Sequence, residues 1–180
     1  MKLEEKKLSS EEIFDGVAIH LFKDEILLPN GNKGVREVIR HPGAVCVLPF
    51  TEDGQVVFVN QFRYALNKVT LEVPAGKLEK GEDPMEAAKR ELYEETGFGG
   101  GEWSHFMTIS PNAGACTNYS HTFLAIGVEP LSTQHLEESE DIKIVLMEPD
   151  EVIRMLRNDE FHQAMMAAPL WKYLAINKLL

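Results

Sequence analysis

The chain has 180 residues, of which 44% are hydrophobic and 26% are charged, and its formal net charge is −11 at pH 7. This length predicts one globular domain over residues 1–180, with enough chain to bury a real core. The negative charge argues against a general nucleic-acid binder, which needs a basic surface. No stretch reaches the roughly 20 apolar residues of a membrane span, and the charged N-terminus does not resemble a secretory signal. The expected location is therefore the cytoplasm.

The first part of the chain reads as strands. Extended segments are predicted at residues 13–28, 35–40, 43–50, 55–62 and 70–73. Two turn signals separate them, Pro29-Asn30-Gly31 and Glu52-Asp53-Gly54, and the second predicts a hairpin.

The second part mixes helices with strands. A helix is predicted over 83–96, strands over 103–109, 119–129 and 142–148, and two further helices from Pro149 and over 161–179. Because strands and helices do not alternate strictly, the pattern favours an α+β fold over a doubly wound sheet.

The helix over 83–96 has clear ends. Asp83 is a typical N-cap, and Pro84 suits the first helical position. Gly97 is a typical helix stop. Gly76, before the helix, and Gly97 are both expected to supply backbone conformations that other residues avoid.

The end of this helix breaks local rules. Glu91 and Glu95 lie four residues apart, and like charges at that spacing destabilise a helix by roughly 0.2–0.5 kcal/mol per pair. Glu94 and Glu95 also occupy the last turn, where the helix dipole favours cations. The alternative is a solvated helix with a charged face. A carboxylate cluster that defies both rules indicates a site for a hard divalent cation such as Mg²⁺.

The same residues resemble a known motif. Gly76, five residues, Glu82, seven residues, Arg90-Glu91-Leu92, one residue, Glu94-Glu95, one residue, and Gly97-Phe98 match the Nudix box at every fixed position. Phe98 stands where that family more often has an aliphatic residue. Outside the box, Gln61-Phe62-Arg63 and Leu71-Glu72-Val73-Pro74-Ala75 are similar to the ADP-ribose and nucleotide-sugar pyrophosphatase branch.

The resemblance implies a fold and an assembly. The expected architecture is a Nudix-type α/β/α sandwich with a mixed central sheet and N-terminal antiparallel strands. Members of this branch are commonly dimers, so the resemblance implies a homodimer in which the strands of residues 1–40 are the dimerisation segment.

The resemblance also implies metal ligands. Glu91 and Glu95 are the first candidates, Glu94 lies close enough to join them and is also a candidate catalytic residue, and the Ala75 carbonyl is a further ligand. The expected cofactor is Mg²⁺, with Mn²⁺ as the alternative. Glu82 and Arg90 are expected to support these ligands, because Arg can hold a carboxylate through two hydrogen bonds.

A general base is expected in the acidic loop before residue 142. Glu140 is the first candidate and Glu138 the second, because similar loops use one or the other position. The alternative is a solvated acidic turn.

Three residues are candidates for substrate binding. Arg63 can grip phosphate through two bonds, or it is an ordinary surface Arg. Glu72 binds metal or substrate, or it is the outward residue of a short strand. Phe14 stacks on a base or sugar, or it belongs to the core or an interface.

The predicted activity is Mg²⁺-dependent hydrolysis of the pyrophosphate bond of a nucleoside diphosphate sugar, which gives a nucleoside monophosphate and a sugar phosphate. ADP-ribose and GDP-mannose are the leading substrates. Two alternatives are a nucleoside triphosphate house-cleaning pyrophosphatase and a non-catalytic Nudix domain that senses a nucleotide. The predicted partners include neither nucleic acid nor membrane.

Overall fold

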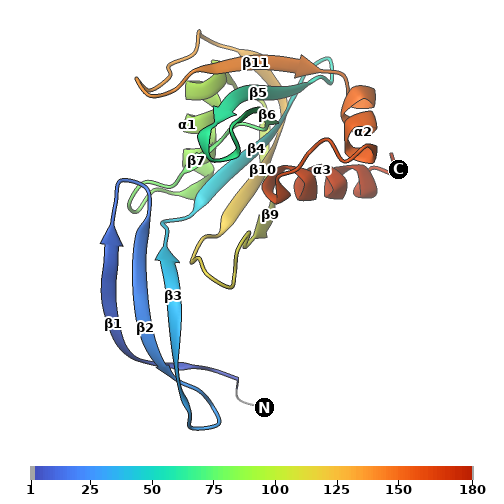
Figure 1. The fold of residues 1–180 in the computed structure, drawn as a ribbon. Helices are drawn as coiled ribbons and strands as arrows, with labels where there is room; N and C mark the ends of the chain where they lie inside the picture. Colours follow the sequence, from blue (N-terminus) through green and yellow to red (C-terminus); the bar gives the residue numbers. More distant parts are fainter. Residues whose placement is uncertain (1–2, 180) are drawn as a thin grey trace. The chain divides into compact units, whose positions relative to one another are not determined.

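The computed structural model describes residues 3–179 (Figure 1). These residues form two compact units. The first contains the described residues up to Gly43 together with Ser110–Tyr119, and the second contains Ala44–Ile109 together with the described residues from Ser120 onward. Each unit is described by itself, and the single domain over 1–180 stays a prediction.

The first unit is a three-stranded antiparallel sheet in the order β1-β2-β3. Its strands are β1 (Lys6–Asp15), β2 (His20–Leu27) and β3 (Lys33–Arg40). The prediction of one extended segment over 13–28 is wrong, because a turn divides it: the Gly16 N–H donates to the Ile19 carbonyl at 2.9 Å. The start of β1 was also missed, since its charged and polar residues do not alternate with apolar ones.

Little of this sheet is buried. Ile26 is the one buried residue in its three strands. Four large apolar side chains of β1 and β3 are exposed: Leu8, Ile13, Phe14 and Val35. The loop 110–119 is attached to β3 by backbone hydrogen bonds at Ile39, which donates to Ala115 and accepts from Thr117. The unit therefore has almost no hydrophobic core of its own.

The second unit contains an eight-stranded mixed sheet. Its strands are β4 (Ala44–Thr51), β5 (Val56–Arg63), β6 (Lys68–Glu72), β7 (Ala75–Lys77), β8 (Phe98–Gly99), β9 (Glu102–Ile109), β10 (Ser120–Pro130) and β11 (Ile142–Met147). The order β11-β5-β4-β10-β8 forms the main path, while β6, β7 and β9 pair with β5, β4 and β10. Only β4 and β10 run parallel in this sheet, and β4 and β5 form the predicted hairpin.

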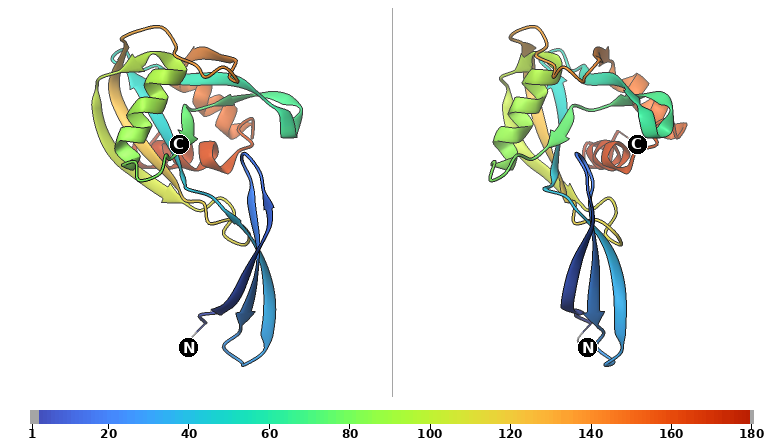
Figure 2. Two further views of the ribbon diagram at one scale, coloured as in Figure 1. Left: turned by 90° about the vertical axis from the view of Figure 1, so that its left-hand side faces the viewer. Right: turned by 60° about the vertical axis from the view of Figure 1, so that its left-hand side comes forward.

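Helices cover both faces of this sheet (Figures 1 and 2). They are α1 (Pro84–Thr96), α2 (Pro149–Arg157) and α3 (Ala164–Ile176). Strand β4 shows how the layers form, because successive side chains point to opposite faces. Val45 and Val47 pack in one apolar cluster with α1, whereas Cys46 and Leu48 pack in another with α2 and α3. The predicted α/β/α sandwich with a mixed central sheet is confirmed.

The last predicted helix is shorter than expected. It begins at Ala164 rather than at Phe161, and Gln163 before it has extended backbone geometry.

Among residues 3–179, no helix combines the length and the apolar content that crossing a membrane would demand.

Candidate functional site

Helix α1 begins and ends as its sequence predicts. The Asp83 carboxylate accepts hydrogen bonds from the backbone N–H groups of Met85, at 2.9 Å, and Glu86, at 3.3 Å, and Pro84 opens the helix. Gly97 ends it in the left-handed region, with φ of 72°. These caps fix both ends of the helix, and so they place Glu94 and Glu95 in its last turn.

Gly76 is required for a different reason from the one predicted. Its φ is not positive, so it supplies no special backbone conformation. Instead, a Cβ built on Gly76 would lie 2.0 Å from the carboxylate carbon of Glu91. The prediction of a backbone role was wrong at Gly76 and is confirmed at Gly97. Strand β7 and helix α1 thus approach so closely that only glycine leaves room for Glu91.

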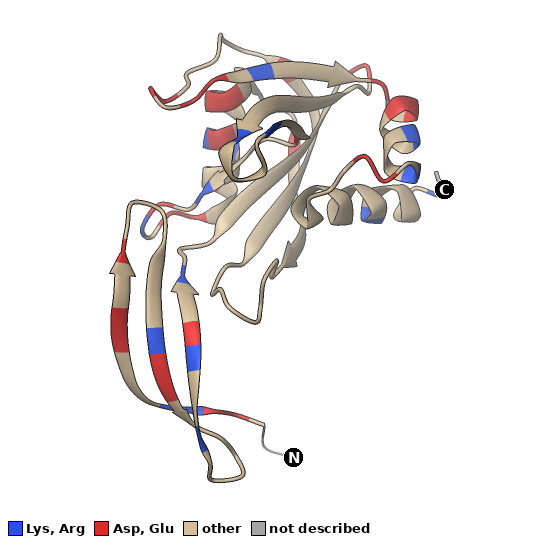
Figure 3. Cartoon of the chain, in the orientation of Figure 1, with Lys and Arg blue, Asp and Glu red and all other residues tan. Residues whose placement is uncertain are grey.

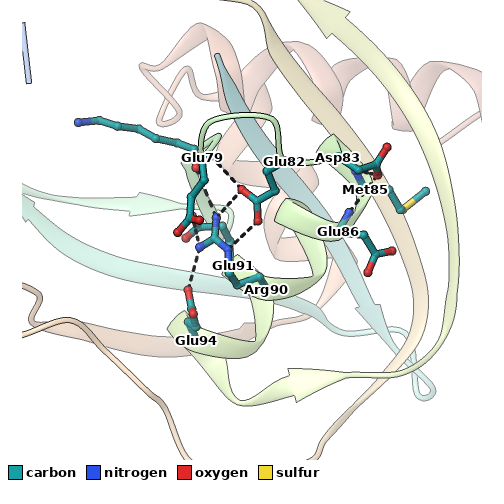
Figure 4. Close-up of polar contacts among 9 residues, drawn as sticks. Glu79, Glu82, Asp83, Met85, Glu86, Arg90, Glu91 and Glu94 are labelled. Atoms are coloured by element: carbon teal, nitrogen blue, oxygen red, sulfur yellow. Dashed lines mark hydrogen bonds and ion pairs between the residues drawn. The ribbon is translucent and has the colours of Figure 1, made fainter. Parts of the chain in front are cut away.

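Arg90, in the middle of α1, donates hydrogen bonds to three carboxylates, one of them before the helix (Figure 4). Its Nε and Nη2 donate to the two oxygens of Glu82 at 2.9 and 3.0 Å, which is the predicted two-bond pairing. Its Nη1 donates to Glu91 and to Glu94, each at 2.9 Å. One guanidinium therefore holds two of the candidate metal ligands in place.

Glu95 is nearly buried, with 3% of its surface exposed. Its Oε2 accepts one hydrogen bond, from the backbone N–H of Ala75 at 3.1 Å. Burial raises the pKa of Glu95 to about 8, the Ala75 hydrogen bond opposes this rise, and the negative charges of Glu91 and Glu140 add to it. Burial likewise raises the pKa of Glu91. A cation bound beside Glu91 and Glu95 would stabilise their ionised forms.

The acidic loop is attached to the end of α1. The Gln134 side chain donates to the Glu95 carbonyl at 2.6 Å and to the Ile142 carbonyl at 3.0 Å. The backbone N–H of His135 donates to the Glu94 carbonyl at 2.8 Å. Figure 3 shows acidic residues both on α1 and just before β11. Sequence reasoning missed Gln134, since a single Gln in a polar loop carries no recognisable signal.

The two candidate bases differ in position. Glu140 is half-buried, and its charge contributes to the raised pKa of both Glu91 and Glu95. Glu138 is exposed, and neither of those shifts involves it. Glu140 therefore stays the first candidate base and Glu138 the second, and the role of either as a base stays a prediction.

Glu72 is fully buried, so the alternative that it points outward from its strand is wrong. Arg63 grips it through two bonds, from Nε to Oε1 at 2.7 Å and from Nη2 to Oε2 at 2.5 Å. Gln61, Thr70 and Gln163 also donate to it. Burial alone would raise the pKa of Glu72, but these hydrogen bonds outweigh burial and lower it. With about four lone-pair positions, the carboxylate is saturated.

Arg63 itself lies within electrostatic reach of the box helix. The positive charge of Arg63 lowers the pKa of Glu95, against the larger effect of burial. The second unit thus brings together most of the predicted site: Arg63, Ala75, Glu91, Glu94, Glu95 and Glu140. Phe14 belongs to the first unit, and its role at this site stays a prediction.

The donor set suits a hard cation. Carboxylate oxygens and a backbone carbonyl are the ligands that Mg²⁺ prefers, and Mg²⁺ usually takes only one or two carboxylates together with water and substrate phosphate. Among residues 3–179, no three His, Cys, Asp or Glu side chains are already arranged around a single metal position. A cation at Glu91 and Glu95 would therefore complete its coordination with other oxygen ligands.

Comparisons with known proteins show the family of this chain. The family model described as NUDIX domain matches residues 40–168. The chain is 36% identical over 179 residues to the ADP-ribose pyrophosphatase of Bacillus subtilis (strain 168), covering 99% of this chain and 96% of that protein. It is also 36% identical over 162 residues to the methanol dehydrogenase activator of Bacillus methanolicus, covering 89% and 88%. A solved structure titled as an ADP compounds hydrolase superposes with a TM-score of 0.85 at 21% identity, covering 98% of both chains, which supports the fold.

Proposed function

Because the chain belongs to the NUDIX domain family, we propose that it hydrolyses the pyrophosphate bond of nucleoside diphosphate sugars. The observation that carries the proposal is the convergence of Glu91, Glu95 and Glu140 with Arg63 in one compact unit. Negative groups for a cation and a positive group for phosphate are what phosphoryl transfer from a diphosphate to water requires.

The proposed cofactor is Mg²⁺. Glu91 and Glu95 would hold it, with Glu94 and the Ala75 carbonyl as further ligands. When bound, the metal would neutralise diphosphate charge and lower the pKa of a bound water. Arg90 would keep Glu91 and Glu94 oriented through the Nη1 contacts.

The protein's own groups would do the rest. Arg63 would bind the diphosphate, and Glu72 would hold the Arg63 guanidinium in place. Glu140 would take a proton from the attacking water as its oxygen bonds to one phosphorus. The bond from that phosphorus to the bridging oxygen breaks, and a nucleoside monophosphate and a sugar phosphate leave. The proton then passes from Glu140 to solvent.

ADP-ribose is the first substrate to test, since the Bacillus subtilis relative is named an ADP-ribose pyrophosphatase. GDP-mannose remains the alternative. The test is a product screen with purified protein and Mg²⁺, in which ADP-ribose, GDP-mannose, other nucleotide sugars and nucleoside triphosphates are compared. Nucleoside monophosphate and sugar phosphate are the expected products. Release of pyrophosphate from triphosphates would favour a house-cleaning enzyme, and no turnover would favour a nucleotide sensor.

We also propose that the protein is cytoplasmic and that it forms a homodimer through the strands of residues 1–40. The support is the first unit's lack of a core: its sheet exposes Leu8, Ile13, Phe14 and Val35. A second copy that covered such side chains would bury apolar surface worth roughly 25 cal/mol per Å². Light scattering after size exclusion should give twice the mass of the 20.3 kDa chain. Replacing Ile13 and Phe14 by Ser should give the monomer.

A further inference from the structure

Gln163 stands at the start of α3 but does not cap that helix. It occupies the N-cap position, and its side chain makes no capping hydrogen bond. Ser, Thr, Asp and Asn are the residues preferred there. Instead, Nε2 of Gln163 donates to Oε1 of Glu72 at 2.7 Å, across 91 residues of sequence. The side chain is thus committed to a carboxylate on β6 and leaves its own helix uncapped.

Glu72, in turn, is the anchor of Arg63. Both oxygens of the buried carboxylate accept from the guanidinium, in the planar two-bond geometry that fixes orientation as well as position. Gln163 and Thr70 both donate to Oε1, from the residue before α3 and from β6. These contacts prevent the carboxylate from rotating, and a fixed carboxylate fixes the guanidinium.

The remaining face of Arg63 is available. Its side chain is 42% exposed, and within residues 3–179 no acceptor contacts Nη1. The guanidinium therefore joins a buried anchor on one side to an open position on the other.

We propose that Gln163 is a positioning residue that, through Glu72, holds the Arg63 guanidinium where it binds the substrate diphosphate. The inference rests on the proposed function, because it takes Arg63 as the diphosphate-binding group. It adds the residue before α3, which lies far in sequence from the box, to the residues that position the substrate.

The surroundings of Gln163 allow a clean substitution. Gln163 lines a cavity of about 150 Å³ whose other lining residues are mixed, namely the apolar Leu66, Val69, Leu71, Phe161 and Met166 and the polar Lys68, Thr70, Glu160 and His162. Leu at position 163 has nearly the size of Gln, finds apolar neighbours and cannot donate. The neighbouring His162 is exposed and lines the same cavity, but it is not among the side chains that donate to Glu72, so His162→Ala serves as the matched control.

The experiment compares Gln163→Leu, His162→Ala and wild type with ADP-ribose and Mg²⁺. We expect Gln163→Leu to raise KM about tenfold with little change in kcat, since Arg63 would bind ground state and transition state alike. His162→Ala should leave both constants unchanged. Thermal unfolding of all three proteins shows whether any loss merely follows instability.

A double-mutant cycle decides whether Gln163 acts through Arg63. Arg63→Lys keeps a positive charge beside buried Glu72, so the protein should fold, but it loses the two-bond grip. In the Arg63→Lys background, Gln163→Leu should change KM less than twofold, because coupled residues are not additive. An unchanged KM in the single Gln163→Leu variant, or a full tenfold effect in the Arg63→Lys background, would overturn the proposal.

A binding readout separates this proposal from the proposed function. If wild type hydrolyses no nucleotide sugar, the proposed function fails. Calorimetric titration with inorganic pyrophosphate and Mg²⁺ then still tests the positioning role. Weaker binding by Gln163→Leu but not by His162→Ala supports it, and equal binding by all three proteins contradicts it.

Discussion

Glu72 and Glu95 are two glutamates of one unit with nearly the same burial and opposite electrostatics. Glu72 is 0% exposed and Glu95 is 3% exposed. Glu72 accepts hydrogen bonds from four side chains, one of them a guanidinium, and its pKa is lowered. Glu95 accepts one backbone N–H and faces other carboxylates, and its pKa is raised to about 8.

Burial alone therefore does not mark the functional group. The cost of desolvating Glu72 is offset inside the protein, so that carboxylate is part of the structure. The cost of desolvating Glu95 is not offset by its protein neighbours, which suits a group that is to hold a cation. The comparison predicts that a substitution of Glu95 lowers activity without loss of stability, whereas removal of Arg63, the main partner of Glu72, lowers stability as well.

The largest expected effect is at Glu95. Glu95→Gln keeps the shape but removes the charge, so kcat/KM for ADP-ribose with Mg²⁺ should fall by about 100-fold or more. The free energy of unfolding in metal-free buffer at neutral pH should stay the same or rise, because Gln carries no proton whose release on unfolding favours the unfolded state. Steady-state kinetics and thermal unfolding check the two halves. Wild-type turnover by the variant would leave the site as a structural cluster.

A second effect on activity is expected at Glu140, whose charge acts on Glu91 and Glu95. Glu140→Gln should lower kcat by roughly 100-fold, at the lower end of general-base effects, with little change in substrate binding. The matched control is Glu138→Gln in the same loop, where a mild effect is expected because Glu138 is exposed. The reverse result would make Glu138 the base, and two silent variants would leave the loop a solvated turn.

The surroundings of Glu95 could be predicted from the sequence, but those of Glu72 could not. The box spacing and the misplaced charges of Glu91, Glu94 and Glu95 were enough to predict a metal site, because the pattern is local and repeats at helical spacing. The α/β/α layers were predictable for a similar reason, since the box also identifies a family whose fold is shared.

The network of Glu72 was not predictable. Its partners Gln61, Thr70 and Gln163 come from β5, β6 and the residue before α3, and no periodicity links them. The fit of Gly76 against Glu91 was also missed, because a close approach between elements appears only once they are packed. Tertiary contacts of this kind leave no signal in local spacing.

The stability of the Glu72 network is the third test of the comparison. Arg63→Ala would leave a buried carboxylate without its main partner, and loss of a charged hydrogen-bond partner costs about 1–3 kcal/mol in unfolding free energy. Denaturant unfolding with Arg36→Ala as the control should show the difference. Arg36 also pairs with a carboxylate, that of Glu5, but on the exposed sheet of the first unit, where ion pairs contribute about 0–1 kcal/mol. Equal losses in both variants would mean that burial does not distinguish the two pairs.

The smallest and most specific effect is on the pH dependence of stability. The pKa of Glu95 is raised in the folded protein, from 4.5 to about 8, so between these values the folded state binds more protons than the unfolded state. The free energy of unfolding in EDTA should therefore fall as pH rises from about 5 to about 8. The pKa of Glu72 is lowered from 4.5, so its contribution has the opposite sign: it is present above that pH and is lost on further acidification. Denaturant unfolding at a series of pH values should show a downward slope in wild type that is clearly smaller in Glu95→Gln, where only the raised pKa of Glu91 still contributes to it. Added Mg²⁺ should flatten the slope as well, because a cation that binds only the folded state with Glu95 ionised adds about 2.7 kcal/mol at a hundred times its Kd. A slope as steep in Glu95→Gln as in wild type would show that Glu95 is already ionised at neutral pH, and the contrast with Glu72 would then disappear.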